Sequence, residues 1–509
     1  MKVNQIKFGA FLSYVIIILS NIVNLFFTPF MLRYLGKSEY GLYALIGSFV
    51  GYIAVLDFGL GNTIIRYVAK YRAENDKKGE ENFLAMSLII YSAISIVVFL
   101  IGFILYFTLP SIFGEALTAM EMDKARIMFI VMLVNLALSL PFNSFSAILS
   151  GYEQFVLPRI LVLLRIILRT GILFILLSAG YKAIAIVVLD TILNIGMMLI
   201  TQLYVFMKLK VRVRLYCFDK LLLQEVFTYS FFVFLNMIVD QIYWRLGQVV
   251  LGIMAGTAAV AVFAIGIQFA QYYMQFSTAI SGLFLPRATQ MVVNGASGEE
   301  MTDLLIKAGR IQFIILGYIL IAFVLFGKQF ILLWAGSDYD LAWVIALVVM
   351  VPLTVPLFQN IGISILQAKK MHAFRSVMCV CVAIMNMFIS LILAKKYGAV
   401  GVATGTTLSI VIGNIIILNL YYHFKVGLNI IRFFKELNAG LAPTMLFTAG
   451  VGCLTLLISG STWLILFVRF VLFSITYLIM MWLLGMNNYE RDLVSKPLNG
   501  ILSIIKNKT

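Results

Sequence analysis

The sequence predicts an all-α integral membrane protein with about fourteen transmembrane helices, grouped as two parallel six-helix lobes and two added C-terminal helices. Of the 509 residues, 62% are hydrophobic and only 12% are charged, whereas a soluble domain carries about 25% charged residues. Apolar runs long enough to cross a bilayer recur with breaks roughly every 25 to 35 residues, unlike the segments of a β-barrel, which alternate over about ten residues. A weak internal repeat divides these runs into two sets.

We expect fourteen membrane-spanning helices, with boundaries placed to about two to four residues. They lie at about residues 9–33, 41–68, 83–109, 125–149, 158–180, 183–207, 226–254, 258–284, 310–332, 341–366, 374–394, 398–422, 441–459 and 463–485. The first apolar run is too long for the core of a cleaved signal peptide, so we expect it to be retained. An even number of spans places both termini on the same side of the membrane.

Basic residues lie mostly in the predicted loops and indicate the topology. The formal net charge of +16 would suggest nucleic-acid binding in a soluble protein, but in a membrane protein loop charges set the orientation. Roughly 25 basic residues fall on the side of the termini and about eight on the other side, which places both termini in the cytoplasm. The main clusters lie within residues 70–78, 208–220 and 369–375, and Lys395 and Lys396 are the main exception. We expect no nucleic-acid partner.

The loops carry no motif that predicts catalysis or metal binding. The four cysteines fall in predicted helices or cytoplasmic loops, which argues against a disulfide framework. Cys379 and Cys381 lie in an apolar helix without histidine or acidic neighbours, so we expect no metal site there. Asp338 and Asp340 form an isolated DxD segment, which is typical of a solvated loop. The loops leave little room for an ATPase module, and we expect neither an enzyme nor a bound cofactor.

The internal repeat relates the two halves of the chain at an offset of about 216 to 220 residues. Three pairs of segments match in the same order, namely residues 35–44 with 255–264, 151–159 with 367–375, and 181–185 with 397–401. The predicted parts are a six-helix lobe at 1–210, a second at 215–425, two added helices at 441–485 and a cytoplasmic tail at 486–509. Each lobe starts on the cytoplasmic side, so the repeats are parallel, and substrate sites in such proteins lie near the middle of the membrane.

The helix that opens the second lobe carries polar residues inside an apolar run. Between residues 236 and 248 these include Asp240, Gln241, Arg245 and Gln248. A charge at the bilayer centre costs about 2.5–3.5 kcal/mol on insertion scales, so such side chains usually face protein or a water-filled cavity. Gln241, Arg245 and Gln248 share one helix face, whereas Asp240 lies roughly 140° from Arg245 around the helix. We interpret this helix as the wall of a hydrophilic path.

The first helix repeats the polar stripe without its charge. Asn21 matches Gln241 in the repeat, and Asn24 and Thr28 continue the same face. Two such stripes facing each other would line a cleft. The alternative is ordinary hydrogen bonding between packed helices, which is favoured for the neutral residues alone. Arg245 reverses that preference, because an intramembrane charge usually has a functional role.

Several segments resemble the MOP flippase superfamily, and in particular its polysaccharide-transport (Wzx-type) branch. They are the Asp240–Arg245 helix, YLGKSEYGLYAL (34–45), LDFGLGNTIIRYVAKYR (56–72) and LSGYEQFVLPR (149–159), and the likeness extends over nearly the whole chain. It implies a V-shaped arrangement of the lobes in a bacterial inner-membrane transporter. The implied substrate is an undecaprenyl-pyrophosphate-linked oligosaccharide, an O-antigen or exopolysaccharide repeat unit, which is moved to the outer leaflet.

The resemblance also implies a mechanism and partners. Transport would proceed by alternating access of the two lobes, coupled to an H⁺ or Na⁺ gradient rather than to ATP. The two added helices would shape a groove for the lipid tail. A polysaccharide polymerase and a chain-length regulator are the implied protein partners of a monomeric transporter.

Arginines inside predicted helices are the candidates for binding the pyrophosphate. Arg165 and Arg169 lie four residues apart on one face of the helix at 158–180, with Arg169 roughly 16 Å deep. A guanidinium suits a pyrophosphate because its planar fork donates two parallel hydrogen bonds and stays charged. We predict an anion-binding set of Arg165, Arg169 and Arg245, with sugar contacts from Asn21, Asn24, Gln241 and Gln248.

Intramembrane carboxylates leave an alternative open for each arginine. An ion pair with Asp57, Asp190 or Asp240 would merely hold helices together. Asp57 and Asp240 are also the candidates for ion coupling, because a carboxylate inside the membrane can carry a proton or Na⁺. The sequence does not separate coupling from pairing with arginine.

Other functions remain as alternatives. A multidrug or cation antiporter of the related MATE branch favours an acidic cavity, whereas bases outnumber acids in the predicted spans. A lipid II flippase uses a similar basic cavity and stays open. An integral-membrane glycosyltransferase would need paired carboxylates or a metal site, and a channel would need a filter sequence.

Overall fold

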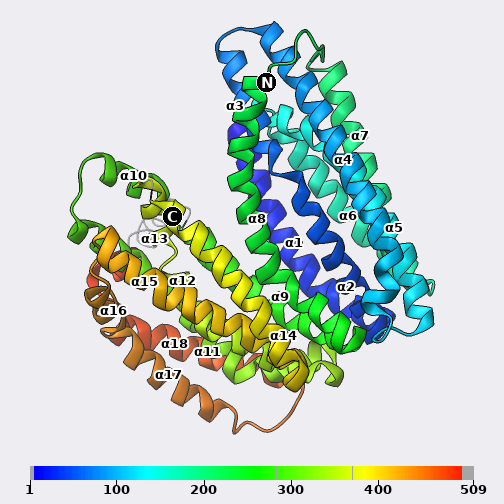
Figure 1. The fold of residues 1–509 in the computed structure, drawn as a ribbon. Helices are drawn as coiled ribbons and strands as arrows, with labels where there is room; N and C mark the ends of the chain where they lie inside the picture. The colour runs from blue at the N-terminus through cyan, green and yellow to red at the C-terminus, as the bar shows by residue number, and fades with distance from the viewer. Residues whose placement is uncertain (1–4, 282–283, 370, 494, 496–509) are drawn as a thin grey trace, which may run out of the picture. The chain divides into compact units, whose positions relative to one another are not determined.

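The computed structural model describes residues 5–281, 284–369, 371–493 and 495 (Figure 1). Within these residues the chain is helical and contains no β-strand, which confirms the predicted all-α class. Twelve of the described helices are long and apolar enough to cross a membrane. The chain is therefore a multi-pass membrane protein, while the count of fourteen spans stays a prediction.

The helices follow the order of the predicted apolar runs. Their bounds are α1 Gln5–Leu35, α2 Lys37–Ile53, α3 Leu60–Ala73, α4 Lys77–Phe113, α5 Ala119–Gly151, α6 Val156–Ser178, α7 Ala183–Met207, α8 Lys220–Met254, α9 Gly256–Ser281, α10 Leu285–Val293, α11 Gly298–Ala335, α12 Asp340–Phe358, α13 Ile361–Ala368, α14 His372–Ile410, α15 Leu418–Tyr421, α16 Ile430–Asn438, α17 Leu441–Thr455 and α18 Trp463–Met480. Short 3₁₀ turns at Ala54–Asp57 and Ser337–Tyr339 and π-helical turns at Val411–Ile417, Tyr422–Val426 and Met481–Gly485 complete the order.

The chain divides into two compact units, unit 1 at Met1–Ala264 and unit 2 at Ile265–Thr509. Within unit 1, α8 packs against α2, α3 and α4. The repeat-based lobes at 1–210 and 215–425, and their V-shaped arrangement, stay predictions. Most of the predicted tail, residue 494 and residues 496–509, lies outside the described part, as do residues 282 and 283 at the end of the predicted helix 258–284.

Breaks at left-handed residues interrupt two long apolar runs. The predicted helix 41–68 is wrong as one continuous helix, because Phe58 and Gly59 have φ angles of 54° and 65° and separate α2 from α3. Glycine adopts such angles without the steric cost that other residues bear. Gly398, with φ 54° and ψ −132°, breaks α14 at the boundary expected between residues 394 and 398.

Helix α5 is the centre of unit 1. It packs against α2, α3, α4 and α7, while α1 packs against α6 and α2 against α8. A buried cluster joins Phe27 and Met31 of α1 to Leu173 of α6 and Ile186 of α7. Lipid tails are as apolar as these side chains, so close packing rather than water exclusion holds the helices together.

Helix α11 has the corresponding role in unit 2. It packs against α12, α16, α17 and α18, and an aromatic cluster that includes Phe326, Phe473 and Tyr477 fills the space between α11 and α18. At the other end of α11, Arg310 forms a buried ion pair with Glu490, with Nε 2.5 Å from Oε1 and Nη2 3.1 Å from Oε2. Arg310 also donates to the backbone carbonyls of Glu436, Ala439 and Gly485.

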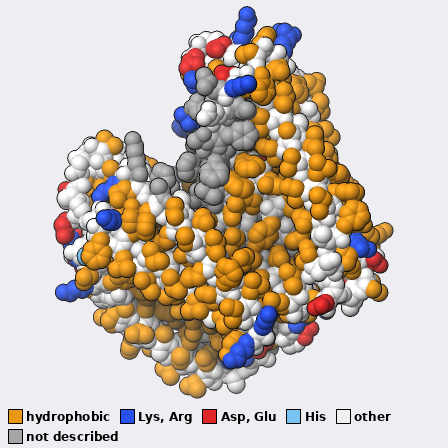
Figure 2. Space-filling view, in the orientation of Figure 1, with side chains coloured by type: hydrophobic (Ala, Val, Ile, Leu, Met, Phe, Trp, Pro, Cys, Tyr) orange, Lys and Arg blue, Asp and Glu red, His pale blue; other side chains and the backbone are white. Residues whose placement is uncertain are grey.

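The exterior of both units is apolar. Figure 2 shows hydrophobic side chains over most of the visible surface, with charged side chains gathered at the ends of helices. Large exposed side chains include Phe26 at 73% exposure and Phe107 at 63%. A soluble protein rarely exposes so much contiguous apolar surface, so these faces are suited to lipid.

Candidate functional site

A cavity of about 290 Å³ with a mixed polar and apolar lining lies within unit 1, between α2, α5, α7 and α8. Its lining includes Arg245 of α8, Asp190 of α7, Asn135 and Ser139 of α5, and Gly47 of α2. Helices α2, α5 and α7 belong to apolar candidate spans. Polar groups gathered inside such spans are costly unless they pair or serve a ligand, so this cavity is the candidate site.

Arg245 reaches from α8 to α2. Its Nη1 donates a hydrogen bond to the Gly47 carbonyl oxygen at 3.1 Å. A Cβ atom on Gly51 would lie only 2.8 Å from Nη1, so glycine at this position leaves room for the guanidinium. Among the described residues, no carboxylate lies within ion-pair distance of Arg245. Its charge is therefore not neutralised by a protein carboxylate there.

Arg169 is held differently. It forms a two-point ion pair with Asp190, with Nε 2.5 Å from Oδ1 and Nη2 3.0 Å from Oδ2. The two side chains are 26% and 20% exposed, and the Tyr43 side chain of α2 lies near the guanidinium. This is the helix-joining pair that the sequence left open as the alternative to anion binding.

Arg165 is connected to the cavity through amide side chains. Its Nη1 donates to Oδ1 of Asn194 at 3.3 Å. The Asn194 amide donates in turn to Asn135 at 2.8 Å and to Ser139 at 3.0 Å, and both of those residues line the cavity. The network thus runs from α6 through α7 to α5, although neither Arg165 nor Arg169 lines the cavity itself.

The glutamines of α8 also face α2. Gln248 accepts a hydrogen bond from the Ser48 hydroxyl, and the Tyr52 hydroxyl donates to the backbone carbonyl of Gln241 at 3.5 Å. The side-chain oxygen of Gln241 is buried and has no hydrogen-bond partner within the described part of the chain. Gln241, Arg245 and Gln248 therefore contribute to one α2–α8 contact.

The other predicted site residues lie outside this cavity. On α1, Asn21 is half-buried and Asn24 is exposed. Asp57 is half-buried in the 3₁₀ turn after α2, near the Tyr91 side chain of α4, and Asp240 is exposed on α8. None of the four lines the cavity. Their roles as sugar contacts and coupling groups stay predictions.

Sequence reasoning missed four polar members of the network. They are Tyr43, Asn135, Ser139 and Asn194. A signal was present, because Asn135 and Ser139 lie one helical turn apart inside an apolar run, and Asn194 lies four residues after Asp190. Neutral polar residues were weighed only on the helices that open the two lobes, so this signal was missed.

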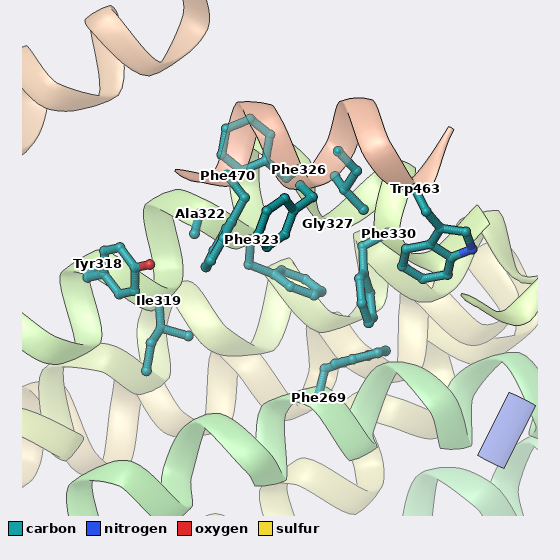
Figure 3. A pocket seen from close by; sticks show the side chains of 12 residues that line it. Phe269, Tyr318, Ile319, Ala322, Phe323, Phe326, Gly327, Phe330, Trp463 and Phe470 are labelled. Carbon is teal, nitrogen blue, oxygen red and sulfur yellow. The ribbon is translucent and has the colours of Figure 1, made fainter. Parts of the chain in front are cut away.

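A second cavity, in unit 2, is apolar and has a volume of about 430 Å³ (Figure 3). Aromatic rings from α9, α11 and α18 form its walls, with Phe269 5.4 Å from Phe323 and Phe330 5.8 Å from Trp463 between ring centroids. Tyr318 lies at one end, where its hydroxyl is 2.7 Å from the Ser474 hydroxyl. Such a surface suits a hydrocarbon chain.

Residues 6–293, more than half of the chain, match the family described as Polysaccharide biosynthesis protein. The chain belongs to this family. This match is consistent with the predicted polysaccharide branch. No curated protein matches the sequence.

Solved structures show that this member of the polysaccharide biosynthesis family has the fold of MOP superfamily transporters. Lipid II flippase MurJ in an inward closed conformation aligns with a TM-score of 0.72 at 17% identity, over 96% of this chain and 99% of that one. An inward-facing multidrug resistance MATE family transporter aligns with a TM-score of 0.61 at 16% identity, over 79% of this chain and 92% of that one.

A third structure, a MOP superfamily transporter from Pyrococcus furiosus, aligns with a TM-score of 0.55 at 14% identity, over 85% of this chain and 94% of that one. The three solved structures are a flippase and two transporters, which is consistent with the prediction that the chain is not an enzyme. The polysaccharide biosynthesis family member is thus a multi-pass membrane protein with the fold of these transporters.

Proposed function

We propose that the protein moves an undecaprenyl-pyrophosphate-linked oligosaccharide, an O-antigen or exopolysaccharide repeat unit, across the bacterial inner membrane. The observation that carries the proposal is Arg245, a guanidinium that lines a cavity between membrane helices and has no carboxylate partner among the described residues. A membrane protein bears the cost of such a charge where it serves a substrate. The family match to polysaccharide biosynthesis supports the sugar-bearing substrate.

The charges around the cavity favour an anion. Arg165, Arg169 and Arg245 carry three positive charges against the single negative charge of Asp190. Pyrophosphate oxygens would accept hydrogen bonds from Arg245 first, and would then compete with Asp190 for the guanidinium of Arg169. A cavity of about 290 Å³ holds a pyrophosphate but not an oligosaccharide. We therefore place the sugars outside it, in contact with Gln241, Gln248, Asn21 and Asn24.

The apolar cavity of unit 2, at about 430 Å³, would hold part of the lipid tail (Figure 3). Its walls include Phe467 and Phe470 of α18, one of the two helices added after the predicted lobes. A polyprenyl chain is apolar throughout, so contact with ring faces satisfies it without any polar partner.

Asp57 and Asp240 are the proposed coupling groups for H⁺ or Na⁺ during alternating access. Asp57 lies where α2 gives way to α3, next to two residues with left-handed φ angles. A carboxylate at a helix break can change its protonation as the backbone there moves. A cytoplasmic location of both termini, and partnership with a polymerase and a chain-length regulator, belong to the same proposal.

Reconstitution of the purified protein in liposomes tests the function directly. A lipid-linked oligosaccharide with a fluorescent sugar is added to one leaflet, and its appearance in the other leaflet is measured. Replacing Arg245 with glutamine removes charge-assisted hydrogen bonds worth about 1.5–3 kcal/mol, so transfer is expected to slow roughly 10- to 150-fold. Arg159, exposed on α6, provides the matched control, since Arg159→Gln removes the same charge away from the cavity.

The outcomes separate the alternatives. Equal rates for Arg245→Gln and Arg159→Gln would refute the anion site. Transfer of lipid II but not of the undecaprenyl-linked oligosaccharide would assign the protein to lipid II flipping. Transport of cationic dyes alone would assign it to the MATE type, against the excess of positive charge at the cavity.

A further inference from the structure

A third cavity, of about 630 Å³, lies in unit 1 where α3 turns into α4. Four cationic side chains line it, Arg72, Lys77, Lys210 and Arg212. Figure 2 shows Lys and Arg side chains, with Asp and Glu side chains beside them, at this end of unit 1. None of its lining residues belongs to the cavity around Arg245. The basic end of unit 1 is thus concave rather than a flat charged surface.

Part of the wall comes from the segment that joins α7 to α8, residues 208–219, which we call the strap. The strap is fixed to α4 by Asn82, whose side-chain oxygen accepts hydrogen bonds from the backbone N–H groups of Tyr216 at 2.7 Å and Cys217 at 3.0 Å. Asn82 is 8% exposed. Glu81 adds a bond from the Tyr216 hydroxyl at 2.7 Å. These contacts hold Lys210 and Arg212 over the cavity.

The acidic groups at this cavity already have hydrogen-bond donors. Glu80 accepts from the Tyr152 hydroxyl at 2.6 Å, and Glu81 accepts from Tyr216. Burial, aided by the bond to Glu80, raises the pKa of the Tyr152 hydroxyl, which keeps it a donor at neutral pH.

None of the four cationic side chains forms an ion pair with a carboxylate within the described ranges. Arg72 lies 4.1 Å from the centre of the Tyr152 ring and donates to the Gly151 carbonyl at 3.0 Å. This contact orients its guanidinium without neutralising it. The cavity therefore keeps an excess of positive charge.

We propose that this cavity is a binding site for a phosphoryl-bearing anion, separate from the translocation site. Two arginine forks and two lysine ammonium groups around a cavity match the oxygens of a phosphate group, which accept charge-assisted hydrogen bonds in several directions. Two sources share this chemistry. One is the headgroup of an anionic phospholipid, which lies near basic residues at the cytoplasmic surface, and the other is a free phosphate or pyrophosphate.

Variants of the strap test the site with a built-in control. Lys210→Gln/Arg212→Gln removes two charges from the cavity, whereas Lys208→Gln/Arg214→Gln removes two charges from the same strap outside its lining. Asn82→Ala is a charge-neutral variant that releases the strap. Binding of phosphatidylglycerol, with phosphatidylcholine as the neutral comparison, is measured by native mass spectrometry of the full chain in detergent. Pyrophosphate binding is measured separately through thermal unfolding.

Each cation near an anionic phosphate contributes on the order of a fivefold factor in affinity. Lys210→Gln/Arg212→Gln should therefore weaken binding roughly 25-fold, Asn82→Ala at least about fivefold, and Lys208→Gln/Arg214→Gln less than about threefold. The same losses should occur in an Arg245→Gln background, which separates this site from the translocation site. If phosphatidylglycerol binds and Lys210→Gln/Arg212→Gln weakens that binding, the ligand is the lipid headgroup. If pyrophosphate binds and phosphatidylglycerol does not, the ligand is the free anion.

Three results would overturn the proposal. The first is an equal loss of binding in the two double variants, because a general surface charge would then explain it. The second is wild-type affinity in Lys210→Gln/Arg212→Gln. The third is the absence of binding of either ligand to the unaltered protein.

Discussion

Replacing Arg310 with leucine is expected to destabilise unit 2 by about 6–8 kcal/mol. Removing one partner of a buried ion pair costs about 3–5 kcal/mol, and Arg310 and Glu490 are 6% and 3% exposed. Arg310 also donates to three backbone carbonyls, and a hydrogen bond of this kind contributes about 1 kcal/mol net. Glu490→Leu should cost less, about 3 kcal/mol, because the guanidinium keeps those carbonyl acceptors.

Stepwise unfolding by SDS in mixed micelles, followed by tryptophan fluorescence, measures the effect. Four of the five tryptophans lie in unit 2, with Trp244 the exception, so the signal reports mainly on that unit. The Arg310→Leu/Glu490→Leu double variant should lose less stability than the sum of the two single variants, because the pair is then removed as a whole.

Arg432 provides the control for this prediction. It forms ion pairs with Glu299, Asp303 and Glu436, but its side chain is 34% exposed. Solvent screening makes such pairs weak, so Arg432→Gln should have a much smaller effect than Arg310→Leu. Equal SDS unfolding midpoints for Arg310→Leu and Arg432→Gln would refute a dominant role for the buried ion pair. A stability loss in Arg310→Leu/Glu490→Leu equal to the sum of the two single losses would refute it as well.

Three further predictions concern single positions in the two units. Asp190→Asn should lower stability by about 1–3 kcal/mol, since it leaves the Arg169 charge without its carboxylate, and a thermal unfolding midpoint equal to wild type would contradict this. Gly398→Ala should destabilise the protein by about 1–3 kcal/mol because φ is 54° there. Gly171→Ala, in an open helical position of α6, should stabilise it by about 0.5–1 kcal/mol. Thermal unfolding midpoints that shift in the same direction for both variants would contradict this prediction. For Tyr152 the folded-state pKa is raised, so its stabilising effect is complete below about pH 10 and is lost as the pH rises above that value. The difference in unfolding free energy between wild type and Tyr152→Phe should narrow from pH 9 to pH 11. A difference that widens over this range in denaturant titrations would contradict a raised pKa for Tyr152 in the folded state.

The helices could be predicted because the length of each apolar run can be read from the sequence without knowledge of any tertiary contact. The break between α2 and α3 could not, because it depends on a left-handed Phe58, and nothing in the identity of a phenylalanine predicts that conformation. Arg245 lies where α8 meets α2, in the lining of a cavity, and its role in anion binding stays a prediction.

The partners of Arg165 and Arg169 show the limit of reading one helix at a time. Helical spacing correctly grouped the two arginines, yet one bonds to Asn194 and the other to Asp190, both on α7. Spacing within a helix says nothing about which residues a neighbouring helix presents. Asn135 and Ser139, on a third helix, were missed for the same reason.

The contact between Gly51 and Arg245 has a consequence for how these two positions vary among related proteins. A side chain at position 51 would occupy the space of the guanidinium, since even a Cβ would lie 2.8 Å from Nη1. The two positions therefore share one fixed volume. Relatives that keep an arginine at 245 should keep glycine at 51, and relatives that lose the arginine should admit alanine or larger residues there. Such paired substitutions would mark, from sequence alone, which members of the family retain a charge at this point in the membrane.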